Sequence, residues 1–197
     1  MKLLHLDASA LGSHSASRGL TAAIVAELTR NAPATEVIYH DLVAKPLSHW
    51  TPVADANDPG VVLGNQMLEE FMAADVVVIG APMYNFTIPS QLKAWIDRIS
   101  VAGKTFRYTA NGAEGLSGGK RLIIASTRGG VYSEGSAAAP FDFQETYLRV
   151  QFGFLGVTDI EFVRAEGLAI SDDQKAEALK YAHAAIGVVS RKAAEGA

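Results

Sequence analysis

The sequence contains no cysteine, carries little charge and has no long apolar run. Without cysteine the chain cannot form a disulfide, a thiol nucleophile, a cysteine-ligated zinc site or an iron–sulfur cluster. Its 17 basic and 21 acidic residues give a formal net charge of −4, and they include no basic block of the kind that binds nucleic acid. The longest strongly apolar stretch, Val76–Met83, is interrupted by Gly80 and Pro82 and is too short to span a bilayer. We therefore expect neither a nucleic-acid partner nor a membrane-spanning segment.

Hydrophobic residues make up 49% of the 197 residues and charged residues 19%, which is typical of a globular protein. No linker, internal repeat or low-complexity tract divides the chain, so we expect a single domain over residues 1–197. Met1 and Lys2 lead directly into a strand-like segment rather than a signal peptide, which predicts a cytoplasmic location. The histidines share no metal-ligand spacing, and we expect no metal site.

Five short apolar segments alternate with amphipathic helical patterns. The expected strands are Leu3–Leu6, Val37–Tyr39, Val76–Ile79, Leu122–Ala125 and Ile160–Val163. The expected helices cover the repeats Leu20 to Leu28, Leu63 to Phe71 and Leu92 to Ile99, a segment near Phe143–Phe152, and a long final stretch to about residue 193. Such alternation predicts an α/β sandwich of three layers, with a five-stranded parallel sheet between helices on both faces, in the flavodoxin-like order 2-1-3-4-5.

Local signals add detail to this outline. Pro89 suits the first turn of the third helix, and Ser171 with Gln174 predicts a capping box at the start of the last one. The segment Thr105–Leu116 contains the turn signal Asn111-Gly112 and predicts a small hairpin outside the main sheet. Asp41–Gly60 is expected to be a long loop.

In such a sheet, ligands bind beyond the carboxyl ends of the strands, at the switch point between strands 1 and 3. The loop after the first strand offers the hydroxyls of Ser9, Ser15 and Ser17 and ends at a helix start, where a phosphate is favoured. The alternative is that Ser15 or Ser17 only caps the helix. Neither a G-x-G-x-x-G nor a G-x-x-x-x-G-K-[ST] motif occurs, which argues against a dinucleotide-binding Rossmann site and a P-loop.

The loop after the third strand contains Met83, Tyr84, Asn85 and Phe86, which suit the face and the polar edge of a planar heterocycle. The alternative is a buried aromatic cluster that holds the loop down. The loop after the fourth strand contains two adjacent glycines, which allow the backbone to approach a ligand. Together the three loops predict a pocket for a phosphorylated flat ring, which FMN fits best.

The segments that carry a resemblance to a known family are Ala81–Phe86 (APMYNF), Gln91–Lys93, Gly103–Thr109 (GKTFRYT), Glu114–Leu116, Arg128–Gly130 and Gly153–Gly156. With them, the sequence resembles the FMN-dependent NADH-azoreductases, flavodoxin-like enzymes that also reduce quinones. The resemblance covers essentially the whole chain. It implies that the FMN phosphate contacts Ser9, Ser15, Ala16 and Ser17, and that the isoalloxazine contacts Met83, Tyr84, Asn85, Phe86, Thr127, Arg128, Gly129 and Gly130. It also implies a homodimer whose substrate pocket, at the subunit boundary, contains Phe86, Tyr108 and Phe154.

The implied activity needs no catalytic side chain, because the chemistry takes place on N5 of FMN. NADH donates a hydride and leaves, and a quinone or aromatic azo compound then takes its place, in a ping-pong scheme that cleaves azo compounds to amines. His14 is a candidate for proton transfer, with a plain surface residue as the alternative. Three features depart from the family: Ala16 replaces a common glutamine, Trp50–Pro59 lacks the basic residue of some members, and Val131–Phe141 is longer than expected.

Other classes of protein use the same fold. An electron carrier without its own small-molecule acceptor is the main alternative, although the hairpin and its aromatic residues favour a substrate pocket. A receiver domain would need paired acidic residues after the first strand, where Asp7 stands alone. A serine hydrolase of the α/β class needs a G-x-S-x-G motif between a strand and a helix; the one such pattern, Gly115–Gly119, instead precedes the expected strand Leu122–Ala125, which argues against that class.

Overall fold

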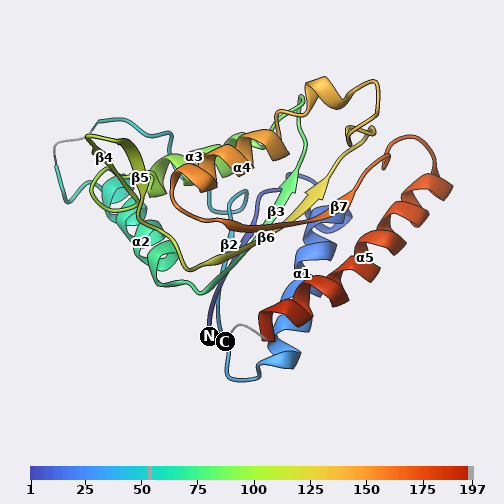
Figure 1. Cartoon of the computed structure of the whole chain (residues 1–197), viewed down its shortest axis with the longest axis horizontal. Coiled ribbons are helices and arrows are strands. Elements are labelled where there is room, and N and C mark those ends of the chain that lie inside the picture. Colours follow the sequence, from blue (N-terminus) through green and yellow to red (C-terminus); the bar gives the residue numbers. More distant parts are fainter. Residues whose placement is uncertain (53–54, 195–197) are drawn as a thin grey trace.

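The computed structural model describes residues 1–52 and 55–194 and contains a five-stranded parallel sheet (Figure 1). Its strands are β1 (Lys2–Asp7), β2 (Glu36–Asp41), β3 (Val76–Pro82), β6 (Arg121–Thr127) and β7 (Asp159–Ala165). They lie in the order β2-β1-β3-β6-β7, which confirms the predicted order 2-1-3-4-5. Every residue of β3 and β6 is buried, as their continuous apolar runs predicted.

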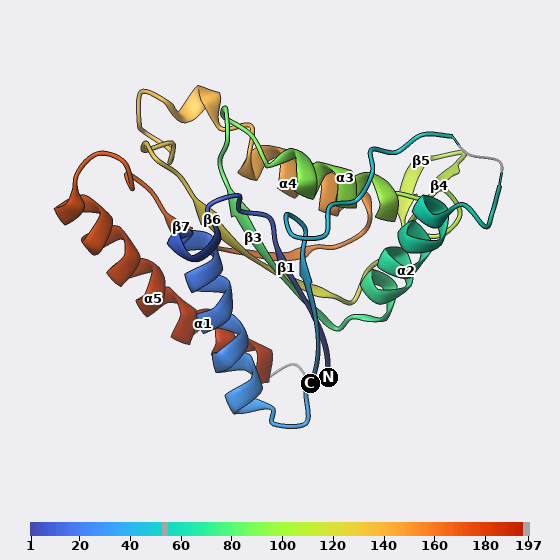
Figure 2. The ribbon, with the colours of Figure 1, turned by 180° about the vertical axis from the view of Figure 1, so that it is seen from behind.

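Within the described residues, five α-helices cover the two faces of the sheet. They are α1 (Ala16–Asn31), α2 (Pro59–Ala73), α3 (Ser90–Ile99), α4 (Glu145–Phe154) and α5 (Asp172–Ala194). Helices α1 and α5 pack on one face, and α2, α3 and α4 pack on the other (Figures 1 and 2). Alternate residues of each strand serve the two cores: Val76 and Val78 meet α1 and α5, whereas Val77 and Ile79 meet the other three helices. Among the described residues, none of the helices combines the length and hydropathy that crossing a bilayer requires.

The helix starts follow their capping residues. The Asp58 carboxylate accepts hydrogen bonds from the N–H groups of Gly60 and Val61 at the start of α2. At the start of α5, the Ser171 hydroxyl accepts one from the Gln174 N–H at 3.1 Å, which confirms the predicted cap. Pro89 occupies the N-cap of α3, one residue before the first turn in which we expected it.

The predicted hairpin consists of β4 (Phe106–Thr109) and β5 (Gly112–Gly115), which pair antiparallel. It lies beyond the C-terminal end of α3, away from the carboxyl ends of β3 and β6 (Figure 1). The hairpin packs very closely on the loop after α4: a Cβ atom added to Gly115 would lie 2.1 Å from the backbone nitrogen of Gly156. Only glycine fits at Gly115, and this close contact fixes the hairpin against α4.

Candidate functional site

The three loops singled out in the sequence meet at the carboxyl edge of the sheet. Strand β1 ends beside β3, with Asp7 opposite Gly80, and β3 ends beside β6. The Met83 N–H continues this pairing by donating to the Thr127 carbonyl at 2.8 Å. The Tyr84 hydroxyl lies 3.3 Å from the Ser9 hydroxyl and accepts a hydrogen bond from the Ala10 N–H at 3.0 Å. These contacts confirm that the loops form one edge, as the parallel topology predicted.

The loop after β1 ends in the first turn of α1, where its hydroxyl groups gather. The Ser15 hydroxyl accepts a hydrogen bond from the Arg18 N–H at 3.3 Å, so Ser15 is the N-cap of α1. It also lies 3.1 Å from the hydroxyl of Ser17, which makes no capping contact. Among the described residues, no group accepts a hydrogen bond from the N–H of Ala16 or Ser17. Ser15 thus caps the helix and also stands beside two free donors.

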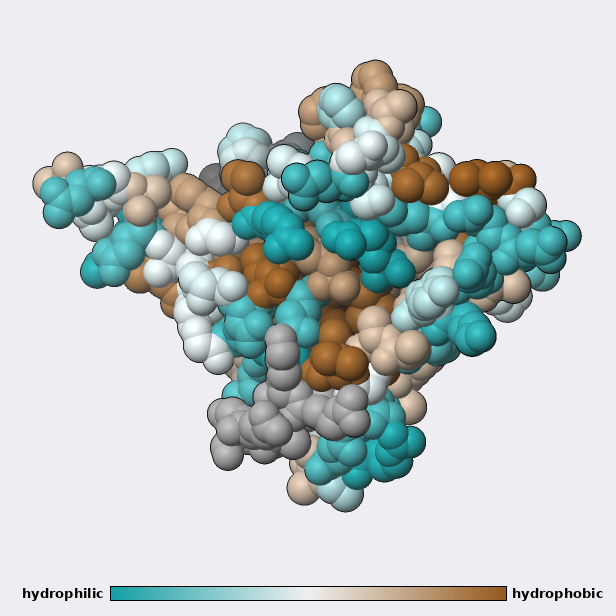
Figure 3. Space-filling view, turned by 45° about the vertical axis from the view of Figure 1, so that its right-hand side comes forward, coloured by the Kyte–Doolittle hydropathy of each residue, from teal (hydrophilic) through white to brown (hydrophobic). Residues whose placement is uncertain are grey.

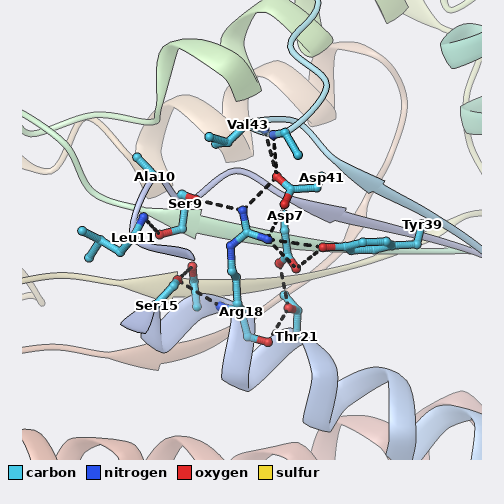
Figure 4. A network of polar contacts seen from close by, with 12 residues as sticks. Asp7, Ser9, Ala10, Leu11, Ser15, Arg18, Thr21, Tyr39, Asp41 and Val43 are labelled. Carbon is cyan, nitrogen blue, oxygen red and sulfur yellow. Dashed lines mark hydrogen bonds and ion pairs between the residues drawn. The ribbon is translucent and has the colours of Figure 1, made fainter. Parts of the chain in front are cut away.

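A polar network lies directly beside this loop (Figure 4). The Arg18 guanidinium donates from Nη1 to Asp41 Oδ2 at 2.7 Å and from Nη2 to Asp41 Oδ1 at 2.8 Å. Nη2 also donates to the Ser9 carbonyl at 2.9 Å. The Arg18 guanidinium, together with the N–H groups of Val43 and Ala44, lowers the pKa of Asp41 to about 2 despite partial burial. Our sequence interpretation assigned no role to Arg18 or Asp41, although Arg18 directly follows the serine-rich loop.

Asp7, at the end of β1, is the second carboxylate of the network. Its oxygens accept hydrogen bonds from the hydroxyls of Thr21 at 2.8 Å and Tyr39 at 3.1 Å, and Oδ2 lies 3.6 Å from His5 Nε2. Burial alone would raise the pKa of Asp7, but His5, Thr21 and Tyr39 together hold it below its usual range. The carboxylate therefore stays charged beneath the loop.

The loop after β3 forms a tight turn in which Tyr84 and Thr87 exchange two backbone hydrogen bonds. Asn85 and Phe86, at the tip, have φ values of +48° and +70°. Asparagine adopts this left-handed region readily, whereas a bulky residue such as phenylalanine is strained there. Half of the Phe86 side chain remains exposed (49%), and Asn85 is exposed as well. Met83 is half-buried behind them.

The loop after β6 is held by Arg128, whose side chain is almost fully buried. Its Nη1 atom lies 2.7 Å from Glu166, and its Nη2 atom lies 2.9 Å from Asp142 and 2.7 Å from Glu145. The guanidinium is therefore committed to three carboxylates and turned away from the loop surface. Of the segment Thr127–Gly130, the main chain of Gly129 and Gly130 is what a ligand can reach.

The main chain of this loop also pairs with the segment that follows β7. The N–H groups of Gly167 and Ala169 donate to the carbonyls of Gly130 and Gly129 at 2.9 and 3.0 Å. No described residue accepts a hydrogen bond from the N–H of Gly129 or Gly130.

Glu145 is one of the carboxylate partners of Arg128. Burial alone would raise the pKa of Glu145, but its hydrogen bond with Arg164 and the charge of Arg128 outweigh burial and lower that pKa.

The three aromatic residues expected in one substrate pocket belong to two separate clusters within the chain. Phe86 packs against Phe141 and Tyr132, with ring centroids 5.6 and 6.3 Å apart. Both partners belong to the segment Val131–Phe141, which our sequence interpretation singled out as longer than expected without assigning a role to either ring. The surface at the top of Figure 3 is a mixture of tan, white and pale teal residues. Tyr108 and Phe154 instead flank Phe106, at the other end of α3, with centroid separations of 5.7 and 4.7 Å.

His14 is exposed at the end of a short 3-10 turn, Gly12–His14, and its side chain makes no hydrogen bond or ion pair with another described residue. Its proposed role in proton transfer remains a prediction. Within the described part of the chain, no three His, Asp or Glu side chains are grouped so that they could hold a metal ion.

Comparison with known proteins agrees with this geometry. A family model described as "Flavodoxin-like fold" matches residues 1–188. A protein from Methylocella silvestris named FMN-dependent NADH:quinone oxidoreductase is 57% identical over 198 residues, which cover 94% of this chain and 97% of the relative. A protein from Xanthomonas axonopodis pv. citri named FMN-dependent NADH:quinone oxidoreductase 1 is 55% identical over the whole of both chains. The crystal structure of an azoreductase from Bacillus anthracis is 30% identical and superposes with a TM-score of 0.89, covering 98% of this chain and 99% of that one.

Proposed function

Since this chain belongs to the flavodoxin-like fold family, we propose that it is an FMN-dependent NADH oxidoreductase that reduces quinones and cleaves aromatic azo compounds to amines. The observation that carries the proposal is the meeting of three loops at the carboxyl edge of the sheet: a hydroxyl-rich helix start, an aromatic turn and a glycine pair. The relatives from Methylocella and Xanthomonas, both more than half identical, are named for this activity with quinones. The azoreductase structure supports the azo compounds as second acceptors.

The start of α1 fits the phosphate group of FMN. The free N–H groups of Ala16 and Ser17 point out of the helix, and the helix dipole favours a negative charge there. The hydroxyls of Ser15 and Ser17 add two further donors, with Ser9 at the start of the loop. Ala16 contributes through its backbone alone, so the absent glutamine side chain removes one donor but not the site.

The other two loops fit the flat ring. We assign its apolar face to Met83, Tyr84 and Phe86, and its polar edge to Asn85 and the free N–H groups of Gly129 and Gly130. When bound, FMN supplies the hydride-transfer chemistry, so no protein nucleophile or base is required. Thr127 and Arg128 keep the glycine pair in place, Thr127 by accepting from Met83 and Arg128 through its carboxylate partners.

We further propose that the protein works as a homodimer in the cytoplasm, with the hairpin of one subunit reaching the site of the other. Tyr108 is 75% exposed and Phe86 49% exposed, and within one chain the turn with Phe86 precedes α3, whereas the hairpin with Tyr108 follows it. A second copy would unite Phe86 with Tyr108 and Phe154 at the subunit boundary. Sedimentation of the purified protein tests this: a monomer at the concentrations that support turnover would contradict it.

The colour of the protein tests the proposed function most directly. The purified protein should be yellow with one FMN per chain, and its flavin bands should bleach when NADH is added without oxygen. A benzoquinone should then restore the bands, and an aromatic azo dye should lose its colour in the same assay. A colourless protein that gains no FMN on reconstitution would refute the proposal. A yellow protein that NADH leaves unchanged would indicate an electron carrier instead.

A further inference from the structure

Arg18 holds both ends of the loop that leads from β1 into α1. Through its side chain, Nη2 donates to the carbonyl of Ser9, where the loop begins, at 2.9 Å. Through its backbone, the Arg18 N–H donates to the hydroxyl of Ser15, where the loop ends, at 3.3 Å. The ends of the loop are therefore set by one residue, which is not itself part of the loop.

The guanidinium also separates the loop from two carboxylates. Figure 4 shows Arg18 between Ser9 and Ser15 on one side and Asp7 and Asp41 on the other. Asp41 takes two hydrogen bonds from it, and Asp7 Oδ2 lies 3.8 Å from Nη1. Without this cation, both carboxylates would repel a phosphate dianion bound at the start of α1.

Four of the five N–H groups of the Arg18 guanidinium are engaged within the chain, and the fifth, on Nε, is buried without a partner among the described residues. Nη1 is shared between Asp41 and the hydroxyl of Tyr39, and Nη2 between Asp41 and the Ser9 carbonyl. The side chain is mostly buried, with 17% of its surface exposed. Any effect on a bound phosphate has to act through the position of the loop and through the neutralised charge of Asp41.

We propose that Arg18 is a positioning residue that makes the site selective for a phosphorylated flavin over the same ring without phosphate. The proposal rests on the proposed function, since it concerns the loop assigned there to the FMN phosphate. The added point is that Arg18, which lies outside the assigned FMN contacts, determines which flavin is bound. Asp41 is the partner that keeps the guanidinium in this orientation.

The test compares the affinities of the flavin-free protein for FMN and for riboflavin, which has the same ring and no phosphate. For Arg18→Met we expect the dissociation constant of FMN to rise about tenfold or more, because a displaced loop would lose at least one of its own hydrogen bonds to the charged phosphate. The constant for riboflavin should change less than about twofold on this reasoning. Arg18→Lys should recover part of the selectivity, because lysine keeps the charge but not the two-pronged contact with Asp41.

Two further variants separate charge from general damage. In Arg18→Met combined with Asp41→Asn, the selectivity should partly return, because the unpaired carboxylate has been removed. Arg30→Met is the matched control. It removes a cation from the same helix, where, among the described residues, Arg30 pairs only with Glu27 at the surface, and it should leave both affinities unchanged. Ser15→Ala with Ser17→Ala shows the loss expected when direct donors are removed.

Each outcome has one reading. If the unaltered protein binds neither flavin, the proposed function fails, and the inference fails with it. If it prefers FMN and Arg18→Met keeps that preference, or weakens both flavins equally, Arg18 is purely structural and the inference is wrong. If Arg18→Met does not fold, the FMN-to-riboflavin ratio of Arg18→Lys decides, and an unchanged ratio overturns the inference.

Discussion

Phe86 holds a backbone conformation that large side chains rarely adopt, with φ at +70°. For a residue with a Cβ atom, the left-handed region costs about 1–2 kcal/mol. The turn between Tyr84 and Thr87 imposes this conformation and turns the ring outward beside Phe141 and Tyr132. Strained backbone of this kind is found mainly at functional sites, which supports the role proposed above for Phe86.

A pair of substitutions isolates the strain at Phe86. Phe86→Gly and Phe86→Ala remove the same ring, but only glycine accepts a φ of +70° without cost. We expect the glycine variant to have the higher free energy of unfolding, by about 1 kcal/mol, measured by denaturant titration. Both variants should lose quinone turnover to a similar degree. At Phe143, which is exposed and has no positive φ, alanine should be at least as stable as glycine. If the alanine variant at Phe86 is also at least as stable as the glycine variant, the turn is unstrained.

Some residue-scale features could be read from the sequence and others could not. The serine-rich loop and the aromatic loop stand out by composition and by their place after predicted strands. The surroundings of Arg128 do not, because its partners Asp142, Glu145 and Glu166 lie up to 38 residues away and reach it only through the fold. Their approach turns the guanidinium inward, away from the surface of the glycine pair.

At the element scale, the sheet was predictable because buried parallel strands have continuous apolar runs, and each run occupies its expected place in the order. The hairpin was predictable from Asn111-Gly112, but the turn lies one residue earlier: Ala110 and Asn111 form the loop, and Gly112, with a φ of +111°, is the first residue of β5 and pairs with Thr109. What the pattern could not reveal is the direction in which the hairpin extends. It follows α3, whose ten residues span about 15 Å, and so emerges far from Phe86.

Substitutions in the aromatic cluster of Phe106, Tyr108 and Phe154 should affect the binding of acceptors more than the binding of FMN. We expect Tyr108→Ala and Phe154→Ala to raise KM or lower turnover for quinones about tenfold, as for a lost aromatic contact of 0.5–1.5 kcal/mol combined with lost apolar burial. FMN affinity should change less than about twofold, because the hydrogen-bond donors assigned to the FMN phosphate and ring edge lie on other loops. Glu114→Gln, which breaks the exposed pair with Arg107 on the same hairpin, is the control and should alter neither. Equal losses of FMN and quinone binding would contradict the assignment.

At the scale of the whole molecule, acid should destabilise the protein through its partly buried carboxylates. The pKa values of Asp7, Asp41 and Glu145 are lowered in the folded state, Asp41 to about 2. In the unfolded chain these carboxyl groups have pKa values near about 4. A lower pKa in the folded state stabilises the fold at pH values above about 4, and this stabilisation is lost as the pH falls towards 2. Thermal unfolding between pH 6 and pH 2.5 should show a steady fall in Tm below pH 5.

Asp41→Asn provides the comparison, because asparagine cannot titrate. Its Tm should be lower at pH 6 and should fall less steeply with acid. At pH 6 the free energy of unfolding of the variant should be lower than that of the unaltered protein by about 1 kcal/mol, after allowance for solvent screening. Parallel curves for the two proteins would show that the pair between Arg18 and Asp41 does not contribute to acid sensitivity.

The contacts between the loop after β6 and the segment after β7 also affect the order in which the proposed flavin site forms in a newly synthesised chain. The start of α1 and the loop before it are held by nearby residues, by Asp41 of β2 and by Tyr84 after β3, whereas Gly129 and Gly130 are held by Gly167 and Ala169, and Arg128 by Glu166. A ribosome makes the chain from its amino end, so the phosphate half of the edge can form long before the ring half. While the segment after β7 is still inside the ribosome, the chain lacks the contacts that hold Gly129 and Gly130. We therefore expect the flavin to bind only when synthesis is nearly finished.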